Sequence, residues 1–195
     1  MTEIPRFWFL GLYGLGIAAF LGTVIRFRGH RGEVERKIGP LPTPVPLVAF
    51  IVAVLILLTR VGEMSAGWPI LRVLGVGLSF YAIVMLPWTM RTLGRFFVPG
   101  AAVLRDHALV TSGPFRLVRH PLLSAVMALW LGAALGTLNW LLLALWPLLL
   151  AGVFISSRDE EGLLREKFGT TYETYAARTG RLIPKVWGRQ QRLSN

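Results

Sequence analysis

Residues 121–157 read PLLSAVMALWLGAALGTLNWLLLALWPLLLAGVFISS and contain no charged side chain. The run divides into two apolar segments, 121–137 and 139–157, which approach the roughly 20 residues that a helix needs to cross a bilayer. Charged or ring-bearing polar residues stand at both outer ends: Arg119 and His120 before the run, and Arg158-Asp159-Glu160-Glu161 after it. The stretch therefore predicts a hydrophobic helical hairpin flanked by two polar clusters.

Three further apolar segments, 7–25, 44–59 and 69–90, approach spanning length. The chain has 195 residues and 54% hydrophobic content, which favours a polytopic membrane protein over a soluble domain. Segment 7–25 is followed by Arg26 and Arg28 rather than by a cleavage site, so it reads as a retained span. We predict an all-α, polytopic integral membrane protein with about five transmembrane helices.

Basic residues set the predicted orientation. The formal net charge is +11, and of the 21 Lys and Arg residues all but Arg6, Arg60 and Arg72 follow the first, third or fifth apolar segment. The positive-inside rule then places the N-terminus outside and the C-terminus in the cytosol, which requires an odd number of spans. This distribution favours a membrane bilayer as the partner of the positive charge and argues against nucleic acid.

Segments between the apolar runs differ in character. Four prolines in residues 38–46 predict an extended connector. The 91–120 segment mixes Arg, aromatic and Gly-Pro elements and is long for a linker, so we expect an ordered, functional loop. Beyond residue 158, apolar side chains at three- and four-residue spacing, broken at Gly169, predict a pair of C-terminal cytosolic helices. Gly132 and Gly136 form a small-xxx-small pair that lets a neighbouring helix approach closely.

Several kinds of chemistry are disfavoured. Cysteine is absent, and the three histidines (His30, His107 and His120) do not have metal-ligand spacing, so no metal site is expected. Gly11, Gly14 and Gly16 lie inside an apolar segment, which leaves a dinucleotide site unsupported. No Asp, Glu or Lys falls in the middle of a predicted span, where a proton or ion relay would need one.

A candidate site remains at the start of the hairpin. Residues 112–121 read SGPFRLVRHP, and Pro121 suits the first turn of a helix. Side chains at such a boundary can meet a polar ligand on one side and a lipid chain on the other. Arg119 considered alone can equally be a positive-inside anchor, and Glu160 and Glu161 can sit in a solvated first turn.

Three ordered runs carry a family resemblance: HALVTSGPFRLVRHPLL from His107, DEEGLLREKFGTTYETY from Asp159, and RTGRLIP from Arg178. Together they resemble the isoprenylcysteine carboxyl methyltransferase family and its phospholipid methyltransferase relatives, over about residues 91–187. The resemblance implies a single domain over 1–195, with N-terminal transmembrane helices in 1–90 and a catalytic core in 91–195. That core would comprise the loop, the hairpin and the C-terminal helices, with its active site facing the cytosol.

The resemblance also implies S-adenosylmethionine as cofactor and a lipidated or lipid-like acceptor in the bilayer. Residue types agree with the cofactor's charges, since Glu160 or Glu161 can meet its ammonium, and His120 with neighbouring backbone N–H groups can meet its carboxylate. Phe115, Leu117, Tyr172 and Tyr175 can wall the adenine. The predicted cofactor-binding residues are His107, Leu109, Val110, Gly113, Phe115, His120, Pro121, Glu161, Tyr172 and Tyr175.

Arg119 and Glu160 are the predicted catalytic residues. Methyl transfer from a sulfonium to a carboxylate needs alignment more than acid or base, and Arg119 can hold a carboxylate bidentately. Carboxyl O-methylation of an isoprenylcysteine-like acceptor is therefore favoured over N-methylation of a phospholipid amine, and both over a non-catalytic membrane scaffold. Leu123 and Phe115 stand where many family members have tyrosine, so the identity of the acceptor stays open. The sequence does not determine the oligomeric state.

Overall fold

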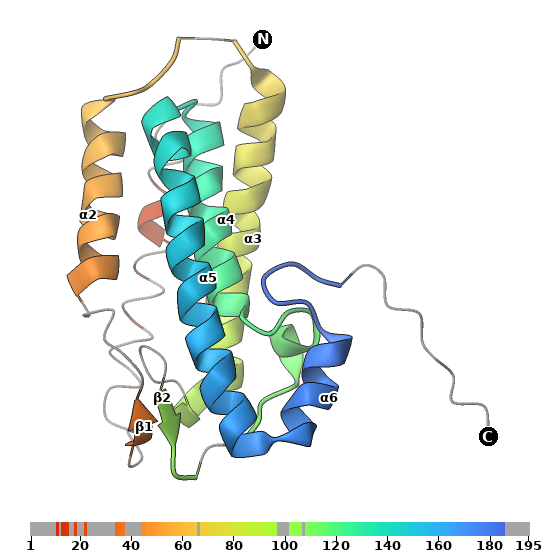
Figure 1. Cartoon of the computed structure of the whole chain (residues 1–195). Coiled ribbons are helices and arrows are strands. Elements are labelled where there is room, and N and C mark those ends of the chain that lie inside the picture. Colours follow the sequence, from red (N-terminus) through yellow and green to blue (C-terminus); the bar gives the residue numbers. More distant parts are fainter. Residues whose placement is uncertain are drawn as a thin grey trace, which may run out of the picture.

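The computed structural model describes residues 11, 13–15, 18, 22, 34–37, 44–65, 67–96, 102–106 and 108–185. Most of the predicted first span, 7–25, lies outside the described residues. The described chain is mostly helical, and its long helices run side by side in a bundle (Figure 1). Helix α2 spans Pro44–Thr59, α3 Pro69–Leu93, α4 Pro121–Gly136, α5 Trp140–Phe168 and α6 Thr170–Arg178.

For the described residues, the bounds of the predicted helices agree closely with those of the observed ones except at two places. Helix α5 does not end near residue 157 but continues through the charged cluster to Phe168, where Gly169 separates it from α6. The expectation of a non-helical connector throughout 38–46 is wrong at its end, because Pro44 and Pro46 lie in the first turn of α2. Proline is tolerated there since the first N–H groups of a helix have no intrahelical partner.

The loop between α3 and α4 holds short regular elements. Strand β2 (Ala102–Leu104) pairs antiparallel with β1 (Val34–Lys37). The 3-10 turns η1 (Gly94–Phe96) and η2 (Gly113–Arg116) frame this strand along the chain. The chain is therefore mostly helical rather than purely so, and the strand pair lies at the same end of the bundle as α6 (Figure 1).

Helices α3 and α4 approach so closely that their backbones touch. A Cβ atom built on Gly75 would lie 2.7 Å from the carbonyl oxygen of Gly132 and would also clash with the backbone nitrogen of Gly136. Ser79 lies one turn farther along α3, and its hydroxyl would lie 2.5 Å from a Cβ built on Gly132. The small-residue pair predicted in α4 therefore packs against α3, where the missing side chains permit van der Waals contact between backbones.

At the far end of the hairpin, buried Asn139 joins the start of α5 to the turn between α2 and α3. Its side-chain oxygen accepts hydrogen bonds from the backbone N–H groups of Leu141 and Leu142, which caps α5. Its amide nitrogen donates to the carbonyl of Val61, 2.9 Å away, in the turn after α2. This junction fixes α5 against the α2–α3 turn, so the helix meets the polar end of the bundle in a set register.

Helices α3 and α5 are long and apolar enough to cross a membrane, and α4 is a shorter apolar helix. Many large apolar side chains on these helices are exposed, including Phe80, Leu148 and Ile155 at 65%, 70% and 60%. Exposed apolar area of this extent is expected where lipid rather than water surrounds a helix. Five spans and the orientation of the termini stay predictions.

Candidate active site

The polar end of the bundle is closed by a strap, residues 179–185, that follows α6. Its Gly180 and Arg181 carbonyls accept hydrogen bonds from the backbone N–H groups of Arg119 (2.8 Å) and His120 (3.0 Å). A Cβ on Gly180 would collide with the carbonyl of Ile183, so the strap needs glycine at this position. These contacts bring residues about sixty positions apart together at the start of α4.

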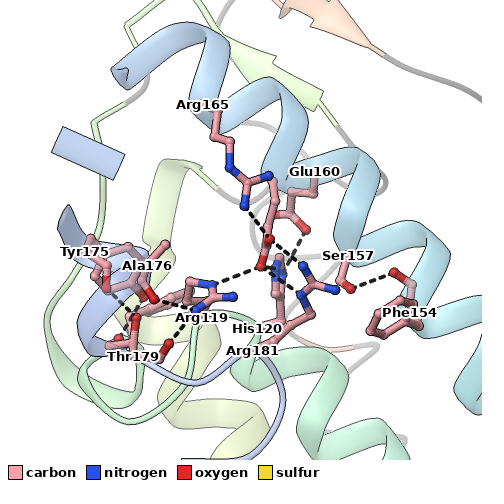
Figure 2. A network of polar contacts seen from close by, with 12 residues as sticks. Arg119, His120, Phe154, Ser157, Glu160, Arg165, Tyr175, Ala176, Thr179 and Arg181 are labelled. Atoms are coloured by element: carbon pink, nitrogen blue, oxygen red, sulfur yellow. Dashed lines mark hydrogen bonds and ion pairs between the residues drawn. The ribbon is translucent and has the colours of Figure 1, made fainter. Parts of the chain in front are cut away.

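Glu161 is the centre of the site. Its side chain is completely buried, yet both carboxylate oxygens face cations (Figure 2). Oε1 accepts from Arg119 Nε at 2.9 Å and from Arg181 Nε at 3.0 Å. Oε2 accepts from Arg181 Nη2 at 2.8 Å and from Arg165 Nη2 at 3.1 Å. A carboxylate has about four acceptor positions, so Glu161 is saturated and is held in its ionised form.

Arg119 serves as a clamp between segments. Besides its bond to Glu161, its Nη1 donates to the carbonyl of Ala176 at 2.9 Å and to the carbonyl of Thr179. Ala176 lies in the last turn of α6 and Thr179 directly follows the helix, where helix geometry leaves carbonyl groups without intrahelical partners. Only 11% of the Arg119 side chain is exposed, and Nη2 makes no hydrogen bond among the described residues. Glu161, rather than Glu160, orients the guanidinium.

His120 lies between Glu160 and Glu161 of α5. Its Nδ1 is 3.4 Å from Glu160 Oε2 and its Nε2 is 3.4 Å from Glu161 Oε1. Burial by itself would lower the pKa of His120, but the hydrogen bonds and charges of Glu160 and Glu161 outweigh it, and the pKa is raised above 6.5. The Glu160 side chain is 42% exposed and has His120 as its ion-pair partner among the described residues.

Two tyrosines of α6, Tyr172 and Tyr175, lie close to the Glu161 cluster. Tyr175 donates from its hydroxyl to the Phe115 carbonyl at 2.8 Å, which holds α6 against η2. Tyr172 is fully buried, its ring lies 5.6 Å from the Arg165 guanidinium, and its hydroxyl has no hydrogen-bond partner within the described part of the chain. Burial, and then the Glu161 charge, raises the pKa of Tyr172, so the hydroxyl stays protonated. A buried hydroxyl without a hydrogen-bond partner costs free energy, and this one is free to accept or donate a hydrogen bond.

The remaining predicted residues lie on the segment that leads into α4. Gly113 begins η2 with a φ of +57° and packs against Thr92 and Trp88 of α3, where a side chain would not fit. Pro121 is fully buried as the first residue of α4. Leu109 and Val110 are half-buried and precede η2 along the chain. His107 lies outside the described residues.

Sequence reasoning missed two members of the cluster, Arg165 and Arg181, and counted them only as positive-inside charges. Arg165 follows Glu161 by four residues on one helix, a spacing that itself indicates an ion pair. Arg181 belongs to the RTGRLIP run, yet its approach to Glu161 depends on the strap. Counting these residues, three guanidiniums face two carboxylates, so the cluster carries excess positive charge even when His120 is neutral.

The motifs of the candidate site resemble those of membrane-bound methyltransferases, and comparison with known families agrees. The phospholipid methyltransferase family profile matches residues 70–171, just over half of the chain. The chain therefore belongs to the phospholipid methyltransferase family. No curated protein matches it. Family membership and the two long apolar helices together indicate an integral membrane protein with methyltransferase activity on lipid-type substrates.

Proposed function

We propose that this protein transfers a methyl group from S-adenosylmethionine to a lipid-borne acceptor at the polar end of the bundle. The observation that carries the proposal is the saturated, buried Glu161 at the boundary between apolar helices and a charged loop. Such a cluster costs free energy to bury and is seldom retained for stability alone. When bound, S-adenosylmethionine supplies an activated methyl group on a sulfonium.

The residues present fit this cofactor at three points. The unpaired Tyr172 hydroxyl offers a buried hydrogen bond. Excess positive charge from Arg119, Arg165 and Arg181 suits an α-carboxylate. Because Glu161 is saturated, the half-exposed Glu160 is the carboxylate that we assign to the α-ammonium. Glu161 then acts as a positioning residue that holds the three guanidiniums and His120 in place.

For the acceptor we favour a carboxylate on an isoprenylcysteine-like lipid, methylated on oxygen. A carboxylate is already ionised near neutral pH, so the protein has to align it rather than deprotonate it. The cation excess of the cluster favours an anionic acceptor. With its other donors in use, Arg119 can offer Nη2 to that acceptor, as a single hydrogen bond rather than the bidentate hold that sequence favours.

N-methylation of a phospholipid amine is the second candidate, and the family match favours it. An amine acceptor needs a nearby carboxylate, and Glu160 is the exposed one. The two candidates separate in one assay. Purified protein with radiolabelled S-adenosylmethionine should methylate N-acetyl-S-farnesylcysteine if the first is right, and phosphatidylethanolamine alone if the second is.

Cofactor binding tests the proposal itself. Calorimetry on detergent-purified protein should detect S-adenosylmethionine binding that weakens roughly tenfold in Tyr172→Phe, which removes one hydrogen bond from a buried site. Thr174→Ala, at an exposed position of the same helix, is the matched control and should bind as wild type does. An absence of binding to the wild-type protein would instead support a non-catalytic scaffold.

We also propose that this end of the bundle faces the cytosol, which supplies the cofactor. The support is the basic-residue distribution, since the cluster and most Lys and Arg residues fall on the same predicted side. The chain has no cysteine, so a single Ala108→Cys gives an unambiguous probe. It should resist an impermeant thiol reagent in intact cells; labelling from outside would reverse the orientation.

A further inference from the structure

A second cationic feature lies beside the Glu161 cluster, on the outer surface of α5. The phenyl ring of Phe154 is 44% exposed, and two guanidiniums lie over it: Arg181 at 4.8 Å and Arg158 at 5.9 Å from the ring centroid. Figure 2 shows Arg181 reaching from the strap to the region between Phe154 and the carboxylates. We call Phe154, Arg158 and Arg181 the arginine–phenyl stack.

The charges of the stack are unequally compensated. Arg181 donates two hydrogen bonds to Glu161. Arg158 has no carboxylate partner in the part of the chain that the structure describes, although Asp159 and Glu160 are its neighbours in sequence. Both guanidiniums lie near one exposed ring, at 4.8 Å and 5.9 Å from its centroid, so positive charge gathers at this surface and suits an anion.

Position along the helix points to the source of that anion. Residues 140–157 of α5 are uncharged, and Arg158 is the first charged residue beyond them. Phe154 lies one turn inside this boundary, and Ile155 and Leu148 are exposed on the apolar part. Arginines at such a boundary extend toward lipid headgroups while their neighbours contact acyl chains.

We propose that the arginine–phenyl stack binds the phosphate group of a membrane phospholipid whose acyl chains lie along α5. Phosphate has several strong acceptor oxygens and suits two guanidiniums better than one. Backbone pairing of the strap, in which His120 N–H donates to the Arg181 carbonyl, keeps Arg181 at this surface. Arg181 therefore belongs both to the lipid site and to the Glu161 cluster.

Native mass spectrometry of the detergent-solubilised full chain tests the proposal with dioleoyl phosphatidylglycerol. Dioleoylglycerol, which has the same chains and no phosphate, is the lipid control. Binding of the phospholipid should weaken roughly tenfold in Arg158→Gln, as expected for one charge-assisted contact. Arg178→Gln removes the same charge from an exposed position on α6 and should leave binding unchanged.

Three results would overturn the proposal: equal binding of dioleoylglycerol, equal weakening in both arginine variants, or displacement of the lipid by millimolar inorganic phosphate. The last would identify a site for a soluble anion. Phe154→Leu keeps an apolar side chain without the ring and should weaken binding as well. Neither cofactor nor turnover is needed, so calorimetry with S-adenosylmethionine on the same samples separates a failure of this site from a failure of the proposed function.

Discussion

The contact between α3 and α4 and the cluster around Glu161 join segments of this molecule by opposite means. At Gly75, Gly132 and Gly136 the helices meet because side chains are absent, and backbone packs directly on backbone. At Glu161 long charged side chains connect α5 to the strap and to the start of α4, and the last two are also joined by backbone hydrogen bonds. The first arrangement stabilises the bundle but offers no side chain to a ligand, whereas the second buries charge and provides hydrogen-bond donors.

The largest effect should follow Glu161→Gln, which removes the charge at the centre of the cluster and nearly preserves the shape. Three guanidiniums would then lack their shared partner, and loss of one member of a buried ion pair costs about 3 to 5 kcal/mol. Thermal unfolding in detergent should show a large loss of stability. Glu160→Gln, at a half-exposed position, is the matched control and should cost less than about 1 kcal/mol. Equal losses would refute the central role of Glu161.

Arg119→Lys should lower methyl transfer roughly a hundredfold, since small displacements of a positioning group have effects of this size. Arg119 donates to Glu161 from Nε and to the carbonyls of Ala176 and Thr179 from Nη1, whereas an ammonium has all its donors on one nitrogen. The measurement is turnover with whichever of the two candidate acceptors the wild-type protein methylates. Arg116→Lys, an exposed position three residues earlier, should retain activity. Full activity of the Arg119 variant would mean that only charge is needed there.

In the glycine contact, Gly75→Ala should destabilise the bundle by about 1 to 3 kcal/mol, because the added methyl meets backbone atoms that cannot move aside. Gly77→Ala adds the same methyl to the same helix, where nothing lies within 4 Å. The higher helix propensity of alanine should leave that control as stable as wild type or more so. Equal destabilisation by the two variants would contradict the backbone contact between α3 and α4 at Gly75.

The smallest effect should be a pH dependence that arises from His120. Its folded-state pKa is raised by Glu160 and Glu161, so the imidazolium contributes stability that is fully present below pH 6.5 and is lost as the pH rises through the folded-state value. The stability difference between wild type and His120→Gln should therefore shrink as the buffer is changed from about pH 6 to about pH 9. A difference that grows with pH would contradict the ion pairs.

Much of the fold is predictable because apolar run length and proline position are local properties. The bounds of α2 and α4, the start of α3, the break at Gly169 and the close approach at Gly132 and Gly136 all follow from such patterns. The end of α5 is not predicted. Its charged residues face the strap and α4, and helix propensity alone does not tell whether they continue α5 or begin a new helix. The strand pair β1–β2 is missed because its partners lie far apart in sequence.

For the candidate site, the sequence by itself determined which residue types gather at the membrane boundary and which family motifs they form. Arg119, His120 and the Glu160-Glu161 pair were identifiable because they stand in ordered motifs at the two outer ends of one apolar hairpin. Only the tertiary structure decided that Glu161 is buried and saturated, that Glu160 stays exposed, and that Arg181 completes the cluster. The physical reason is that burial and ion pairing depend on the strap, whose backbone hydrogen bonds to residues 119 and 120 close a loop of about sixty residues.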